Sequence, residues 1–158
     1  MNEPTAANSS PETRQSPKIE WLGSIPFVVI HLLALGTIWT GVTPAAAICC
    51  AVLYFARMFG VTGGYHRYFS HRTYKTSRVF QFLLAFLAQT SAQKGTLWWA
   101  AHHRHHHIHS DQPRDIHSPI QNGFWYSHML WLFDPNTSAT DYSRIPDLAR
   151  YPELRFLN

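Results

Sequence analysis

Histidine is the residue type in this sequence best suited to chemistry, because ten of its 11 histidines fall between positions 66 and 128. Neutral imidazole is the commonest protein metal ligand near neutral pH, so this concentration indicates a metal site. The first group is His66 and His71, spaced H-x4-H. Residues five apart diverge by about 140° on an ideal helix. A helix carrying both rings toward one ion must therefore end or distort between them.

The second group lies in the tract HHRHHHIH and can be read in two registers. Residues i, i+3 and i+4 share one face of a helix, so three rings with the spacing H-x2-H-H can point at one ion. The spacing alone does not decide between the two registers. One consists of His103, His106 and His107, and the other of His102, His105 and His106.

The elements that must position these rings begin with a membrane hairpin. No Asp, Glu, Lys or Arg occurs from Trp21 to Ala56. Residues 21–40 supply twenty positions, which as a helix cross a hydrocarbon core of roughly 30 Å. Gly41 to Pro44 breaks this helix, and a second apolar segment covers residues 45–65. We expect residues 18–65 to form a transmembrane helical hairpin, preceded by a disordered tail over residues 1–17.

Basic residues flank the hairpin at both ends. The positive-inside rule therefore places both ends of the hairpin, and the histidine groups with them, in the cytoplasm. Arg57 is close enough to the end of the second segment to extend toward the headgroups. The basic residues are Arg14 and Lys18 before the hairpin, and Arg57, Arg67, Arg72, Lys75 and Arg78 at its other end.

Two further uncharged stretches do not make convincing spans. Residues 79–93 are short, and a crossing there would put the two histidine groups about 30 Å apart on opposite faces. Residues 116–133 are rich in aromatic side chains, and we expect an interfacial helix there. The expected fold class is thus all-α integral membrane, with residues 66–158 forming part of a cytosolic, histidine-rich helical cap.

Four motifs carry a resemblance to a known family. The sequence is similar to the membrane-bound acyl-CoA delta-9 desaturases, of the stearoyl-CoA type. That pattern selects the register His103, His106 and His107 and leaves His102 and His105 as extras. The motifs are GGYHRYFSHRTYK (63–75), WAAHHRHHH (99–107), DIHSP (115–119) and GFWYSHMLWL (123–132).

The resemblance implies a di-iron enzyme that uses O2 to introduce a cis double bond, at the delta-9 position, into a saturated acyl chain. Two electrons would come from cytochrome b5 or a ferredoxin. The family's tunnel-bend residues map onto Gln93 and Trp99 as substrate-binding positions. The implied metal ligands are His66, His71, His103, His106 and His107.

Two departures from the family pattern matter. A third histidine box is missing, since no histidine follows His128, so we expect an N-terminal fragment that is inactive alone. Ala101 and His102 stand where animal relatives carry an Arg-Asp pair thought to contact coenzyme A. The acyl carrier, coenzyme A or a lipid, therefore stays open.

Other classes of function rank lower. A membrane-anchored, histidine-rich metal-binding module would not need the fixed spacing of His66 and His71, and a di-iron membrane hydroxylase typically has a different first-box spacing. The net charge of +4 needs no nucleic acid, because the basic residues cluster beside the hairpin. Cys49 and Cys50 are adjacent within an apolar run, which excludes a disulfide scaffold. We expect His31 to be a neutral, hydrogen-bonded packing residue.

Overall fold

The computed structural model describes residues 18–158, so the predicted tail at residues 1–17 lies outside the described residues. Within the described range every regular element is a helix and no strand is present. The longer elements are α1 (Trp21–Leu35), α3 (Pro44–Phe59), the π-helix η1 (Gly60–Ser70), α4 (Arg78–Gln89) and α5 (Thr96–His109). The shorter ones are α2 (Thr37–Thr40), α6 (Pro119–Asn122), α7 (Phe124–His128), the 3-10 turns η2 (Leu130–Phe133), η3 (Pro135–Thr137) and η4 (Tyr142–Arg144), α8 (Pro146–Ala149) and α9 (Pro152–Phe156).

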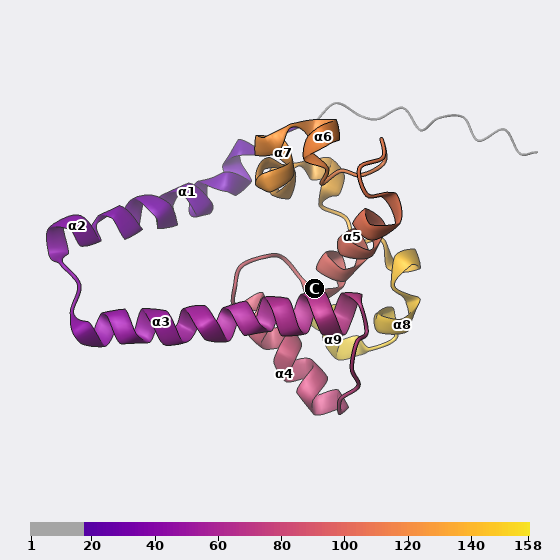
Figure 1. Cartoon of the computed structure of the whole chain (residues 1–158), viewed down its shortest axis with the longest axis horizontal. Coiled ribbons are helices and arrows are strands. Elements are labelled where there is room, and N and C mark those ends of the chain that lie inside the picture. The colour runs from indigo at the N-terminus through magenta and orange to yellow at the C-terminus, as the bar shows by residue number, and fades with distance from the viewer. Residues whose placement is uncertain (1–17) are drawn as a thin grey trace, which may run out of the picture.

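A helical hairpin projects from one side of the helical body (Figure 1). Its arms are α1 with α2 and α3 with η1, joined at the far end by residues 41–43. The second arm begins where the Thr43 side chain accepts a hydrogen bond from Ala46 N–H and Pro44 occupies the first turn, as expected for a helix start. By length and composition, residues 21–40 and 44–70 are each able to cross a bilayer.

The surface of the hairpin is apolar and exposed. Leu33 is 71% exposed and Trp39 is 82% exposed, and their neighbours along both arms are similar. Soluble proteins rarely present a continuous apolar surface of this extent to water. The predicted hairpin is thus present, with a surface suited to lipid.

The second arm differs from the predicted segment 45–65, because the helix continues without a break to Ser70. His66 therefore lies inside the helix and not after it. The last eleven residues form the π-helix η1, which is the distortion that the spacing of His66 and His71 required. That prediction is confirmed.

The remaining apolar stretches fold into short elements. Helix α4 has 12 residues and is too short to be a candidate span, in agreement with the sequence. The predicted single aromatic helix over residues 116–133 is wrong. Gly123 adopts a φ of 76°, which ends α6, and Met129 leaves helical geometry after α7. The stretch therefore forms three short helices, which are α6, α7 and η2.

The core lies where η1 packs on α5 and α4. Tyr65 and Phe69 of η1, Leu97 of α5 and Ile145 and Leu154 near the C-terminus are fully buried. Small residues on α4 and α5, including Ala88, Ala100 and Ala101, are also buried and let the backbones come close. This core fixes the π-helix against the histidine-bearing helix.

Candidate metal centre

The π-helix brings the first histidine pair together. The N–H of His71 donates to the carbonyl oxygen of His66 at 3.1 Å, an i to i+5 hydrogen bond. Residues five apart consequently lie over one another, and the two ring centroids are 4.5 Å apart. On a regular α-helix these rings would diverge, so the local distortion is what makes a shared ligand set feasible.

Helix α5 positions the second group by ordinary helical spacing. His103 and His107 are one turn apart, with ring centroids 4.6 Å apart. The helix starts after Gly95, which has no capping side chain of its own. The side chain of Asn158 takes that role, because its Oδ1 accepts a hydrogen bond of 2.7 Å from Trp98 N–H.

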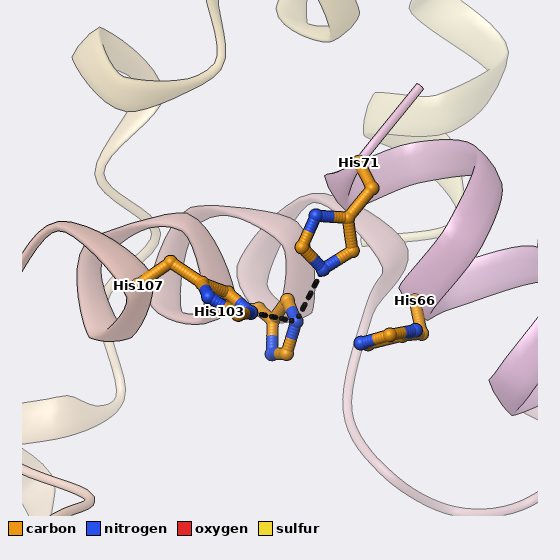
Figure 2. A group of neighbouring side chains, drawn as sticks. All are labelled: His66, His71, His103 and His107. Atoms are coloured by element: carbon orange, nitrogen blue, oxygen red, sulfur yellow. Dashed lines mark hydrogen bonds between the residues drawn. The ribbon is translucent and has the colours of Figure 1, made fainter. Parts of the chain in front are cut away.

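Four rings converge from these two helices (Figure 2). One ligand atom from each lies within 4.8 Å of the others, so the four could hold one metal ion. Nε2 of His103 is 3.1 Å from Nε2 of His71 and 3.1 Å from Nε2 of His107. The four are His66, His71, His103 and His107.

The surroundings of His103 and His71 favour their neutral rings. Burial, followed by the neighbouring His107 and His66, lowers the pKa of His103 to about 3. Burial also lowers the pKa of His71, and His66 and His107 add to the effect. Neutral imidazole keeps a lone pair for a metal at neutral pH, whereas imidazolium does not. The donor chemistry therefore fits a transition metal such as iron, zinc, copper or nickel.

His106 stands beside this group and not within it. Its Nδ1 is 2.9 Å from Oδ2 of Asp115, and its ring centroid is 6.4 Å from that of His103. Asp115 is fully buried and also accepts hydrogen bonds from the N–H groups of Asp111 and His117. Burial opposes ionisation of this carboxyl, but the hydrogen bonds from His106 and the two N–H groups outweigh it and lower its pKa.

A carboxylate bonded to one ring nitrogen is how metal-binding histidines are commonly oriented, leaving the other nitrogen for the ion. The sequence predicted His106 as a ligand but did not identify this carboxylate. The available signal was the motif DIHSP, nine residues after His106.

A cavity of about 850 Å³ adjoins the group. It lies between α1, which contributes Phe27 and His31, and the cap. Gln93 and Trp99 both line it, and the Trp99 ring stacks on His103 with centroids 4.6 Å apart. His31 makes the expected hydrogen bond, 2.7 Å to the carbonyl oxygen of Phe27, yet it lines the cavity and is not packed in the core.

The two extra histidines of the tract bond to backbone oxygens. His102 Nδ1 is 2.9 Å from the carbonyl oxygen of Trp98, and burial lowers its pKa to about 4 despite this bond. His105 Nε2 is 3.0 Å from the carbonyl oxygen of Arg114. Neither belongs to the group of four. The group of four thus contains two members of the register His103, His106 and His107 and no member of the other.

Sequence reasoning gave no role to several residues that surround the site. His117 and His128 line the cavity with His102. Arg104 bonds to the end of η1 and to Asp147. These partners are distant in the chain, so a spacing rule could not have found them.

Comparison with known proteins finds fatty acid desaturases in each case. The family model described as fatty acid desaturase matches residues 42–157. The sn-2 palmitoyl-lipid 9-desaturase of Nostoc sp. (strain 36) is 34% identical over 148 residues, covering 90% of this chain and 52% of the relative. The acyl-CoA 5-desaturase AL21 of Anemone leveillei is 33% identical over 131 residues, covering 81% of this chain and 40% of the relative.

A third relative, the chloroplastic palmitoyl-monogalactosyldiacylglycerol delta-7 desaturase of Arabidopsis thaliana, is 32% identical over 146 residues, covering 87% of this chain and 39% of the relative. The chain thus spans about half the length, or less, of these curated relatives. Their names differ in acyl carrier and in double-bond position, so they do not select the acyl-CoA delta-9 type.

Proposed function

The chain belongs to the fatty acid desaturase family, and from that premise we propose that its histidine cluster serves the O2-dependent introduction of a cis double bond into a saturated fatty acyl chain. The delta-9 position is part of the proposal. In the balanced reaction the acyl chain loses two hydrogens, an electron donor such as cytochrome b5 or a ferredoxin supplies two electrons, and O2 with two protons becomes two waters.

The observation that carries this proposal is the contact between the histidine group and the cavity. Trp99 lines the cavity and stacks directly on His103. The cavity volume is in the range of small-ligand sites, and α1 of the hairpin forms one wall. An acyl chain entering along α1 would pass the histidine group without crossing water. Gln93 and Trp99 would then shape the bend of the bound chain.

The proposal assigns five histidines to two iron ions: His66, His71, His103, His106 and His107. Bound iron would supply the activation of O2. The geometry separates the roles, because four of the rings converge and His106 is held apart by Asp115. Five nitrogens do not complete the coordination of two irons, so these five histidines alone should not support activity.

The membrane context of the proposal follows from the hairpin. The bilayer would take up residues 21–40 and 45–65, with both ends of the hairpin and the histidines on the cytoplasmic side. The substrate would be an acyl-CoA or an acyl-lipid. In this arrangement η1 and α5 hold the rings, and Trp99, which stacks on His103, lines the cavity together with Trp131.

The test combines metal analysis with fatty-acid analysis. The longest natural product containing this chain is expressed in iron-supplemented cells that lack their own desaturase, then purified for elemental analysis. We expect iron in the protein and new monounsaturated fatty acids in the cells. His103→Ala should remove both. His105→Ala is the matched control, because His105 bonds to Arg114 outside the cluster.

A metal-binding module or a hydroxylase would give different results in the same experiment. Zinc, copper or nickel in place of iron, with an unchanged fatty-acid profile, would support the metal-binding module. Hydroxylated fatty acids in place of unsaturated ones would support the hydroxylase. Either result contradicts desaturation.

A further inference from the structure

Arg104 stands between His103 and His105 in the sequence. Its side chain hydrogen-bonds to backbone carbonyl groups and to a carboxylate, and not to the histidine rings. Its Nε donates to the carbonyl oxygen of Ser70 at 3.1 Å, and its Nη2 donates to that of Phe69 at 2.7 Å. These are the last two residues of η1, immediately before His71. Arg104 therefore ties the helix that carries one histidine pair to the end of the helix that carries the other.

The remaining bonds of Arg104 go to the C-terminal segment. Nη1 donates to Oδ1 of Asp147 at 2.7 Å and to the carbonyl oxygen of Arg144 at 3.3 Å, and Nη2 donates to Oδ2 of Asp147 at 3.1 Å. A guanidinium has five N–H donors in a fixed fork, so every donor of Arg104 is used. A lysine has three donors on one atom and cannot reproduce this pattern.

Asp147 also contacts the residues that follow η1. Besides its paired bonds to Arg104, its Oδ2 is 3.4 Å from Nη1 of Arg72, the residue after His71. The side chains of Arg104 and Asp147 are 18% and 17% exposed. An ion pair this far from solvent adds little net stability over apolar packing, and the best-supported use of such pairs is to fix one arrangement of the chain.

We propose that Arg104, held by Asp147, is a positioning residue that sets η1 and α5 at the separation at which His66, His71, His103 and His107 can share one metal ion. The inference rests on the proposed function for the presence of a metal. The bonds of Arg104 do not reach the rings, so its effect is exerted through the backbone of residues 69 and 70.

The test is a Co²⁺ titration of the purified 158-residue chain in detergent, followed by the visible absorption of the bound ion. Arg104→Lys keeps the charge and loses the fork, and Asp147→Asn keeps the shape and loses the ion pair. Each should weaken Co²⁺ binding about 10- to 100-fold and change the absorption bands. Helix content by circular dichroism should stay unchanged.

Arg78→Lys is the matched control. Arg78 forms an equally close two-bond pair with Glu153, but it joins α4 to α9 and contacts no histidine. It should leave both Co²⁺ affinity and spectrum as in the wild type. If Arg104→Lys does not fold, Asp147→Asn still decides, because the backbone bonds of Arg104 remain.

Co²⁺ binding needs no O2, electron donor or acyl substrate, so the two proposals fail in different ways. Wild-type affinity and spectrum in Arg104→Lys and Asp147→Asn, equal weakening in Arg78→Lys, or a wild-type chain that binds no Co²⁺ would overturn the positioning role. Weakened Co²⁺ binding in the two variants supports it, even where the longest natural product yields no unsaturated fatty acid in cells. That last result would contradict the proposed function alone.

Discussion

At the scale of single residues, neighbouring histidines of one tract have different partners. His103 and His107 face other imidazoles, whereas His102 and His105 bond to backbone carbonyl oxygens. Neither His102 nor His105 belongs to the group of four whose ligand atoms converge. Substitutions along this tract should therefore differ sharply in effect.

His103→Ala should abolish metal binding by the isolated chain, because His103 is the ring within 3.1 Å of two others. His102→Ala should reduce binding only mildly. Elemental analysis of the purified variants, at equal expression, measures the difference. Normal metal content in His103→Ala would remove this residue from the ligand set.

Asp115→Asn should weaken metal binding through His106. The carboxylate accepts from the ring, and an amide in its place would reverse or lose that bond. Loss of such a carboxylate commonly costs about 10- to 100-fold in metal affinity. The measurement is the number of ions bound at saturation and their affinity. Asp141→Asn, on an exposed turn, is the control and should bind as the wild type does.

At the scale of elements, the π-helix and its glycines decide how closely η1 approaches α4. A Cβ at Gly60 would lie 2.9 Å from the backbone N and Cα of Ala88, whereas one at Gly64 would make ordinary contacts from 3.5 Å outward. Backbone atoms cannot turn aside as a flexible side chain can. The two positions in one helix therefore form a matched pair.

Gly60→Ala should destabilise the chain by about 1–3 kcal/mol, because α4 must move away from η1. Gly64→Ala should be neutral or slightly stabilising, since alanine favours a helical backbone by up to about 1 kcal/mol. Thermal unfolding in detergent, followed by circular dichroism, compares the two. Equal melting temperatures would show that close packing at Gly60 is not required.

At the scale of the whole molecule, the Arg78–Glu153 pair joins α4, next to the hairpin, to the C-terminal α9. The hydrogen bond from Arg78 lowers the pKa of Glu153 from 4.5 to about 2. A depressed carboxyl pKa stabilises the folded state above the unfolded pKa and loses that effect as the pH falls through the folded one.

The melting temperature of the wild type should therefore exceed that of Glu153→Gln above pH 4.5, with the difference vanishing toward pH 2. Because the Arg78 side chain is 63% exposed, the difference should be small and should shrink in high salt. A difference that persists unchanged at pH 2 would show that it does not arise from the ion pair.

The orientation of the hairpin is also a property of the whole molecule. With Cys49 and Cys50 replaced by serine, Val42→Cys in the loop between the arms should react with a membrane-impermeant maleimide added outside intact cells. Lys75→Cys, beside the histidine cluster in sequence, should react only after permeabilisation. Labelling of Lys75→Cys in intact cells would contradict the proposed topology.

Local sequence determined the hairpin, the helix carrying HHRHHHIH and the need for a distortion between His66 and His71. These features depend on the composition of a few turns and on helical periodicity. The same reasoning wrongly predicted one helix over residues 116–133, because Gly123 adopts a positive φ that interrupts the helix within this aromatic segment. Composition shows how apolar a segment is, but not where its backbone turns.

Only the tertiary structure decided which histidines converge and what holds them. The Asn158 cap on α5 spans 60 residues, the Arg104–Asp147 pair spans 43, and His103 meets His71 across 32. Such contacts form because η1 packs on α5 through the core around Tyr65, Phe69 and Leu97. Spacing rules describe neighbours along one element, whereas the packing of one element on another determines which groups share a site.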